Sequence, residues 1–426
     1  MTSRRLFLSA TAGLAATVGL AACGAPAGGG GTALRLGWWG NETRNKMTND
    51  AIAAFQTANP GVTVAGEPGE WASYWEKLAT QTAGNDAPDV IQMSINYIRE
   101  YGDRGALLDL KDAGVESGDL APGTIESGQV GDKLYGINGG VNSSVIVGNP
   151  TLFEKAGVDL PDDTTWTWES YRDLAAELTA KLPKGTYGST SFWGGSDTMF
   201  NAWLRQHGKA LYTETSLGFD VADAQGWLEL MQTFLDAKAI PTAAETAEDD
   251  AKPLAQQMVA TDRSAMSLSY SNIIAAIDQA SGHDMALLRP PSVTGKAAER
   301  QAWFNASMLW SISARSKNPE LAGKLVNFLV NSVEGGEILL AERGLPANTK
   351  VREAIKSKLS PADQKAATFL TEIEPELGTP PIIPIAGASD LPAILQRHSA
   401  DVAFGRKSPA DAATAFVDEV TKNIKR

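Results

Sequence analysis

Two kinds of segment alternate along the chain. One kind has the apolar pattern of a strand, and in the other kind apolar positions recur at the spacing of a helix. Short apolar runs of strand length occupy residues 33–39, 62–66 and 88–93. Residues 48–61 and 72–84 instead repeat their apolar positions at helical spacing, and the first of these stretches ends in an Asn-Pro-Gly stop signal. This alternation predicts an α/β fold with mostly parallel strand pairs.

The same alternation returns in the second half of the chain. We expect strands at 187–193 and 264–270, followed by helices at 197–207 and 272–280. A β-rich segment, Val141–Val147, lies between the two halves and leads into a further helix. Its place in this order predicts a crossover between two lobes.

The start of the chain has the pattern of an export signal rather than of a fold element. Arg4 and Arg5 precede an almost unbroken apolar run, and Cys23, the only cysteine, follows it in the sequence LAAC. This order predicts a signal peptide over 1–22. LAAC resembles a bacterial lipobox, in which the cysteine is acylated and the chain is cut before it. The sequence SRRLFL resembles a Tat signal, with Sec export as the alternative.

A transmembrane anchor is the other interpretation of the apolar run, which nearly reaches spanning length. The hydroxyl residues and glycine within it favour the signal peptide. We therefore expect Cys23 to be a lipid attachment point on the outer side of the cell membrane, where several acyl chains hold a protein firmly. Residues 23–32, rich in glycine, have the composition of a flexible tether.

Length and charge limit what the exported part can be. The chain has 426 residues, enough for about two domains, and a lone cysteine allows no disulfide within it. Its net charge of −13 becomes −15 when Arg4 and Arg5 leave with the signal peptide. An acidic body argues against nucleic acid and against attraction to anionic lipid.

Several motifs occur in an order that is specific as a set, although each is weak alone. They are AGNDAPDVIQMSINYIREYGDRGALLDL, KLYGINGG, NPTLFEKAGVDLPDDTTWTWESYRDLAAEL, QHGKALYTE, DRSAMSLSYSN and SKNPELAGKLVNFLVNSVEGGEILLAERGLPANTKV. Together they resemble the extracellular solute-binding proteins of ABC importers, specifically the family-1 carbohydrate-binding group related to maltose-binding protein. The resemblance covers nearly the whole mature chain.

The resemblance implies a two-lobed periplasmic-binding-protein-like fold of type II. Each lobe would be a mixed, mostly parallel sheet flanked by helices, with lobe I formed by 33–145 plus 306–350 and lobe II by 146–305 plus 351–426. The lobes would close on a sugar by hinge motion, and the protein would deliver it to the permease subunits of the transporter. The resemblance implies no cofactor, no metal, no catalysis and a monomer.

Two segments depart from the family pattern. VGNP stands where relatives commonly have a Tyr-Asn pair, and AWFNASMLW replaces a glycine-rich turn. Both lie near the expected cleft, so they bear on the identity of the sugar more than on the fold.

Candidate ligand residues follow the ends of the predicted strands, because ligands of open α/β sheets bind outside the carboxyl ends of strands. Aromatic residues make up only 7% of the chain, yet Trp and Tyr recur at these ends beside Asn, Asp and Glu. Flat rings cover the apolar face of a sugar, while amides and carboxylates bind its hydroxyls. The candidates are Trp38, Trp39, Asn41, Glu42, Glu70, Trp71, Tyr74, Ser94, Asn138, Trp193, Asp197, Tyr270, Trp303 and Asn305.

Other aromatic residues are expected in the core. Trp75, Trp166, Trp168, Trp227 and Trp310 lie within or at the start of predicted helices and strands. Only one of Trp38 and Trp39 should face the cleft, because neighbouring side chains of a strand point to opposite faces. Asp197 also has the position of a helix cap.

Two other functions remain open at this stage. A secreted glycoside hydrolase or lyase would need paired carboxylates, and no spacing of Glu42, Glu70 and Asp197 demands such a pair. The sequence also contains no zinc motif, nucleophile elbow or phosphate loop. The same fold binding a polyamine would need carboxylates that converge around aromatic rings.

Two late segments complete the chain. Residues 374–387, EPELGTPPIIPIAG, are too proline-rich for a helix or a central strand. They either border the cleft or form a rigid surface connection, and we favour the surface connection. Residues 408–426 predict a capped amphipathic helix that packs on the second lobe.

Overall fold

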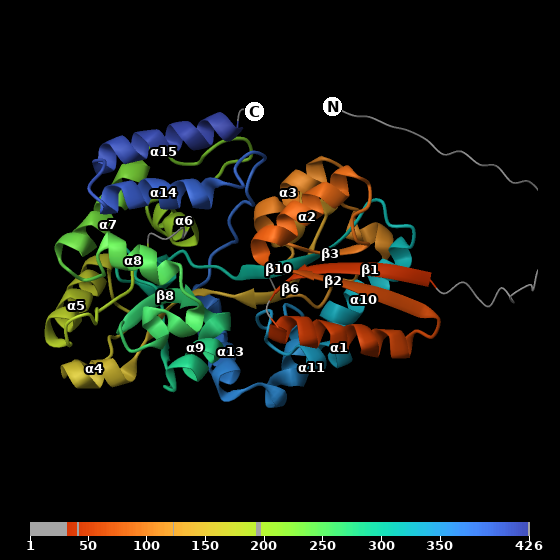
Figure 1. Ribbon diagram of the computed structural model, residues 1–426, viewed down its shortest axis with the longest axis horizontal. Helices are drawn as coiled ribbons and strands as arrows, with labels where there is room; N and C mark the ends of the chain where they lie inside the picture. The colour runs from red at the N-terminus through yellow and green to blue at the C-terminus, as the bar shows by residue number, and fades with distance from the viewer. Residues whose placement is uncertain (1–31, 41, 122, 193–196, 425–426) are drawn as a thin grey trace, which may run out of the picture.

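The protein has two lobes, each built around its own sheet (Figure 1). The structure, a computed structural model, describes residues 32–40, 42–121, 123–192 and 197–424. In Figure 1, β6 (Ile137–Asn142) and β10 (Asn305–Ile312) reach from the first lobe toward the second, where β8 (Met266–Tyr270) lies among the helices. The two-lobed α/β fold predicted from the sequence is confirmed.

The first lobe contains a mixed five-stranded sheet in the order β2-β1-β3-β10-β6. Its strands are β1 (Thr32–Trp39), β2 (Val62–Gly69), β3 (Val90–Met93), β6 (Ile137–Asn142) and β10 (Asn305–Ile312). β1 pairs in parallel with β2 and β3, whereas β10 is antiparallel to both β3 and β6. Leu34 and Leu36 of β1 are fully buried, as the apolar pattern predicts.

Helices cover this sheet with their apolar faces. They are α1 (Glu42–Ala58), α2 (Trp71–Ala83), α3 (Ile95–Asp103), α10 (Pro319–Asn331) and α11 (Val333–Leu339). α1 buries Ala51, Ile52 and Phe55, which recur at helical spacing. A small hairpin of β4 (Gln129–Val130) and β5 (Lys133–Leu134) follows two short 3₁₀ helices, η1 (Leu110–Ala113) and η2 (Glu126–Gly128).

The second lobe contains a three-stranded sheet in the order β8-β7-β9. Its strands are β7 (Ser144–Gly148), β8 (Met266–Tyr270) and β9 (Ala286–Leu288). β7 is antiparallel to both neighbours, so the expectation of mostly parallel pairing is wrong for this sheet. Long connections join β7 to β8, and such connections allow a strand to enter in either direction.

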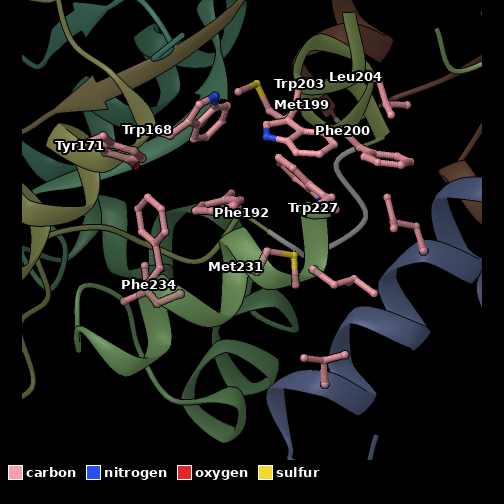
Figure 2. Close-up of a cluster of buried hydrophobic side chains, with 14 of the residues drawn as sticks. Trp168, Tyr171, Phe192, Met199, Phe200, Trp203, Leu204, Trp227, Met231 and Phe234 are labelled. Atoms are coloured by element: carbon pink, nitrogen blue, oxygen red, sulfur yellow. The ribbon is translucent and has the colours of Figure 1, made fainter. Parts of the chain in front are cut away.

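Helices surround the sheet of the second lobe. They are α4 (Pro150–Ala156), α5 (Trp168–Lys181), α6 (Asp197–Gln206), α7 (Val221–Asp236), α8 (Ala243–Asp250), α9 (Ile274–Ser281), α12 (Thr349–Ile355), α13 (Pro361–Ile373), α14 (Leu391–Ala403) and α15 (Pro409–Ile424). Side chains of α4, α5, α6, α7, α14 and α15 form an aromatic core, whereas α9, α12 and α13 pack in a separate apolar cluster with β7. Figure 2 shows Trp168, Phe192 and Trp227 gathered at the centre of this core. The rings of Phe192 and Trp227 lie 5.6 Å apart. The C-terminal helix α15 packs on α7 and α14.

The strand expected at 187–193 is absent from the described residues 187–192. Tyr187 forms one isolated bridge to Ser264, while Ser189 and Thr190 donate single backbone hydrogen bonds to different partners. The segment lies so close to α5 that a Cβ on Gly188 would be 1.8 Å from the Ala175 carbonyl oxygen. This contact holds the chain in an irregular path beside the sheet.

The chain passes between the lobes at several places. Ser143 alone separates β6 from β7, and the segment between β9 and β10 leads back to the first sheet. Residues 377–388, here named the strap, join α13 to α14. Ile383 of the strap packs in the first-lobe cluster around Trp39, whereas Ile385 packs in the second-lobe core. No helix in the described part of the chain is long and apolar enough to span a membrane.

Candidate functional site

A cleft of about 490 Å³ lies where the two lobes meet. Its walls include β1, α2 and β10 of the first lobe, α6 and β8 of the second, and the strap. The lining residues are Trp39, Arg44, Trp71, Ile95, Asn96, Ser127, Asn142, Asp197, Thr198, Tyr270, Asn272, Ile273, Trp303, Phe304, Asn305, Ala306, Ser307, Met308, Pro380 and Pro381.

The first lobe contributes an exposed ring on a buried aromatic base. Trp71 begins α2 and is 47% exposed, while Trp39 at the end of β1 is 8% exposed. Their rings meet edge to face, with centroids 5.0 Å apart. Trp75 packs against both rings, and the ring of Tyr97 packs on Trp75 with the two centroids 4.2 Å apart. This packing fixes Trp71 so that its side chain is offered to a ligand at low entropic cost.

Two amides emerge together where β6 and β10 leave the first sheet. Asn142 and Asn305 are directly paired across these strands. The Asn142 Nδ2 donates to the Ser307 Oγ at 2.8 Å, but its buried Oδ1 has no partner among the described residues. The Oδ1 of Asn272 on the opposite wall is likewise unpartnered there. A buried acceptor without a partner costs free energy, which a hydrogen bond from a ligand hydroxyl would recover.

The second lobe contributes a carboxylate beside a phenol. Asp197 begins α6, and the next residue, Thr198, has its Oγ1 3.1 Å from the Tyr270 hydroxyl. Burial raises the pKa of Asp197 to about 6, although backbone N–H groups of residues 197 and 198 oppose this shift. The desolvated carboxylate is therefore a strong hydrogen-bond acceptor above that pH.

Arginine side chains hold two parts of the cleft wall in place. Arg205 lies over the Trp303 ring at 5.1 Å and donates to the Thr379 carbonyl oxygen of the strap at 2.7 Å. Arg44 donates through Nε to both oxygens of Glu342, at 2.8 and 3.0 Å, and through Nη1 to the Trp39 carbonyl oxygen. These bonds tie the cleft to segments distant in sequence.

The structure brings part of the predicted set together. Trp39, Trp71, Asp197, Tyr270, Trp303 and Asn305 line the cleft. Trp38 does not, because it points into the first-lobe core, where it is fully buried and its Nε1 donates to the Asn45 Oδ1 at 2.8 Å. Its assignment as a ligand residue is wrong, and the expected alternation of Trp38 and Trp39 explains why.

Five other predicted residues lie outside the cleft lining. Tyr74 is buried and donates to the Gln92 carbonyl oxygen at 2.6 Å, and the side chain of Ser94 caps α3. Asn138 is 1% exposed, and its Oδ1 accepts the Gly140 N–H. Glu42 and Glu70 are exposed residues at the starts of α1 and α2. The buried positions of Tyr74, Ser94 and Asn138 contradict direct ligand contact in this arrangement of the lobes, whereas a ligand role for the exposed Glu42 and Glu70 stays a prediction.

Several predictions fall on residues outside the described part of the chain. They concern the signal peptide of residues 1–22, the lipidated Cys23 with the tether that follows it, and the ligand residues Asn41 and Trp193.

Sequence reasoning missed part of the cleft. Pro380 and Pro381 line it, so the preference for a surface connection at 374–387 is wrong for this part of the segment. Arg44 and Ser307 carried no signal, since their roles depend on contacts across the fold. Asn142 and Asn272 were not missed, because the strand-end rule points to both: Asn142 ends β6 and Asn272 follows β8. Asn305, in contrast, is the first residue of β10.

Within the described ranges, no group of His, Cys, Asp and Glu is placed to hold a metal ion. The cleft lining offers aromatic rings, amides, hydroxyls, one carboxylate and the guanidinium of Arg44.

Comparison with known proteins places the chain among binding proteins. A family described as "Bacterial extracellular solute-binding protein" matches residues 50–368. An "Uncharacterized lipoprotein in oleD 5'region" of Streptomyces antibioticus is 30% identical over 178 residues, which is 40% of this chain and only 38% of the relative's length.

Solved structures agree in fold. The extracellular solute-binding protein family 1 member from Alicyclobacillus acidocaldarius is 25% identical, with a TM-score of 0.71 over 93% of this chain and 99% of that one. A periplasmic oligogalacturonide-binding protein from Yersinia enterocolitica, in complex with saturated digalacturonic acid, is 20% identical, with a TM-score of 0.79 over 93% and 99%. The predicted family is confirmed. This chain belongs to the bacterial extracellular solute-binding proteins.

Proposed function

We propose that this chain is the substrate-binding lipoprotein of an ABC sugar importer, which captures a mono- or oligosaccharide in the cleft between its lobes. The observation that carries the proposal is the composition of that cleft. Trp71, Tyr270 and Trp303 lie beside Asn142 and Asn305 in a single lining. The ligand named for the Yersinia protein of the same fold is also a saccharide.

The chemistry of a sugar fits this lining. A pyranose has faces of C–H groups, which pack on aromatic rings, and a rim of hydroxyls. The unpartnered oxygens of Asn142 and Asn272 would accept hydrogen bonds from the sugar hydroxyls. The Asp197 carboxylate would accept a stronger hydrogen bond because it is charged. A ligand without hydrogen-bond donors would leave these acceptors unsatisfied on closure.

Capture would proceed by movement of one lobe toward the other. The proposed lobes are 33–145 plus 306–350 and 146–305 plus 351–426. Because Ser143 alone joins β6 to β7, a few backbone torsions there are sufficient for a hinge. Closure would bring Trp71 of the first lobe nearer to Tyr270 of the second and remove water from the sugar.

We further propose that acylated Cys23 anchors the mature protein to the cell membrane after export by the Tat route. There the monomer would present its loaded cleft to the permease subunits. The match to a lipoprotein of Streptomyces antibioticus supports the anchor.

Binding without catalysis fits the carboxylates of the cleft. Glycoside hydrolysis requires two carboxyl groups flanking the bond to be cleaved. Asp197 is the single carboxylate among the described lining residues, since Glu42 and Glu70 lie outside it. We infer that a bound sugar leaves unchanged.

The test is ligand-dependent melting of the full chain with Cys23→Ser, against mono-, di- and trisaccharides and polyamines. A ligand at one hundred times its Kd adds about 2.7 kcal/mol to the free energy of unfolding. We expect at least one sugar to raise the Tm and to be recovered intact. A shift caused by polyamines alone, or recovery of a cleaved sugar, would contradict the proposal.

A further inference from the structure

A second cavity of about 260 Å³ lies in the second lobe beside the cleft. Tyr270 lines both, so the two spaces adjoin at its ring. The second cavity, here named the annex, is bounded by β8, α8 and the segment around Thr190. Its lining residues are Ser144, Thr190, Ser191, Phe192, Pro241, Thr246, Asp249, Asp250, Gln257, Met258, Val259, Ser267, Leu268, Ser269 and Tyr270.

The walls of the annex carry hydroxyl groups. The hydroxyl groups of Thr190 and Ser267 share a hydrogen bond, with their oxygens 2.8 Å apart. Thr246 lines the annex and is only 5% exposed, and its buried Oγ1 has no hydrogen-bond partner among the described residues. An unsatisfied buried hydroxyl costs free energy, which a polar ligand in the annex would recover.

Two carboxylates end the helix that faces the annex. Asp249 is 8% exposed, and its Oδ1 accepts the Met258 N–H at 2.9 Å. Asp250 follows it as the last residue of α8; this residue lines the annex, is exposed to solvent, and has no ion pair among the described residues. Acidic side chains at the C-terminal end of a helix oppose the helix dipole, which favours cations there. Burial also raises the pKa of Asp249.

The nearby cations are engaged elsewhere. Lys252 pairs with Glu248 at 2.8 Å, and the Arg263 Nε donates to the Gly185 carbonyl oxygen at 3.1 Å. Both lower the pKa of Asp249 through space, but neither lines the annex. No Lys or Arg is among the described lining residues. The annex therefore presents negative charge without a cation of its own.

We propose that the annex is a subsite for a sugar unit that carries a protonated amine, so that the transported ligand is an amine-bearing oligosaccharide. This inference rests on the proposed sugar-binding function. The amine would bind Asp249 and Asp250, the ring hydroxyls would bind Thr246 and the serines of β8, and the rest of the ligand would extend past Tyr270 into the cleft.

A neutral ligand fits this arrangement less well. It would bury the two carboxylates further without neutralising them, and uncompensated charge is costly to desolvate. A polyamine would neutralise them. A protonated polyamine carries only N–H donors, however, so the O–H groups of the annex and the N–H groups of the cleft amides would find no acceptor on it. An amine on a hydroxylated ring satisfies both sets of groups.

The test measures Kd by calorimetry with the full chain carrying Cys23→Ser. The β-linked probes are the glucosamine trimer, the N-acetylglucosamine trimer and cellotriose, which differ at C2 of each ring. Kanamycin and maltotriose are the α-linked probes, and spermidine represents polyamines. We expect an amine-bearing sugar to bind at least about tenfold more tightly than its neutral counterpart, as for a hydrogen bond to a charged group.

Variants assign the preference to the annex. Asp250→Asn and the double variant Asp249→Asn/Asp250→Asn should reduce the preference for the amine-bearing sugar to about threefold or less. The asparagines keep the shape of the side chains and the hydrogen bond from the Met258 N–H. Glu248→Gln makes the same change of charge on the same helix outside the annex and should preserve the preference. The Tm without ligand verifies folding.

Each contrary outcome has a distinct meaning. Equal binding of neutral and amine-bearing sugars, or an equal effect of Glu248→Gln, overturns the annex as an amine subsite but leaves the sugar-binding function intact. Binding of spermidine in preference to every sugar, or binding of no sugar at all, overturns both.

Discussion

At the scale of single residues, the side chains of the cleft fall into two groups. Some are exposed and can contact a ligand, and others are buried and pack against the exposed ones. Trp71 is half exposed, whereas its neighbours Trp39 and Trp75 are less than one tenth exposed. The edge-to-face contacts among the three rings fix the orientation of the exposed one. Loss of Trp71 should therefore affect binding more than stability.

We expect Trp71→Ala to weaken sugar binding about tenfold or more, because it removes the most exposed aromatic side chain among the described lining residues. The Tm without ligand should change little, since the side chain is 47% exposed. Calorimetry and thermal melting measure the two effects. Trp71→Phe retains a ring and should keep part of the affinity; a variant that binds normally would remove Trp71 from the site.

Asp197 makes stability depend on pH. Burial raises its pKa to about 6 from an ordinary 3.8, so the folded protein holds this proton more tightly than the unfolded chain. The charged form therefore destabilises the ligand-free protein above pH 6, and this cost disappears as the pH falls below 3.8. Asp197→Asn should add on the order of 2 kcal/mol to the free energy of unfolding at neutral pH.

Denaturant titrations between neutral and acid pH test this expectation. The difference between Asp197→Asn and the original chain should shrink toward zero as the pH falls through 6 to 3.8. Glu70→Gln, at an exposed position that makes no capping bond, serves as the control. A pH-independent difference would show that lost contacts, rather than ionisation, account for the effect.

Part of the site could be predicted because local rules determine it. The strand-end rule identified Trp39, the last residue of β1, and alternation along β1 allowed one of two tryptophans to be cleft-facing. Asn305 lines the cleft although it begins β10 instead of following a strand. The choice between Trp38 and Trp39 depends on which face of the sheet the helices cover. Pro380 enters the cleft through tertiary packing of the strap, which no local pattern encodes.

At the scale of elements, the crossing between the lobes depends on close backbone packing. Leu345 exchanges backbone hydrogen bonds with Val141, so the loop after α11 lies directly on β6. A Cβ on Gly140 would be 2.2 Å from the Arg343 carbonyl oxygen, a distance that forces the backbone to move. Glycine at this position permits the loop to seal the end of the first sheet.

We expect Gly140→Ala to destabilise the protein by about 2 kcal/mol or more, as overpacking against backbone does. Gly118→Ala is the matched control, because a Cβ at Gly118 meets no atom within 4 Å. Urea denaturation compares the two variants. Equal stabilities would mean that the loop carrying Arg343 shifts without cost.

The elements themselves were predicted to different degrees. Helices with a clear apolar stripe, such as α1, and the buried strand β3 could be predicted because burial and period coincide. The expected strand at 187–193 failed because its apolar residues serve the helical core: Phe192 packs on Trp227 and Phe234 rather than in a sheet. Apolar runs report burial, but they do not report which neighbour covers them.

At the scale of the whole molecule, the proposed capture requires that the lobes approach each other. We expect a bound sugar to reduce the radius of gyration in small-angle X-ray scattering, because closure removes the open cleft. Trp71→Ala at the same sugar concentration should remain in the open form for lack of binding. An unchanged scattering profile at saturating sugar would contradict capture by closure.

The position of β10 in the first sheet has a consequence for how the chain folds. β10 fills the gap between β3 and β6, yet the ribosome makes it only after all three strands of the second sheet. Until then, both of its neighbours keep an open edge, which invites pairing with other chains. Pairing this distant in sequence is slow to form. The sheet of the first lobe therefore stays incomplete until the second lobe has been synthesised. Chaperones that cover the open strand edges during this time should determine the yield of the exported protein.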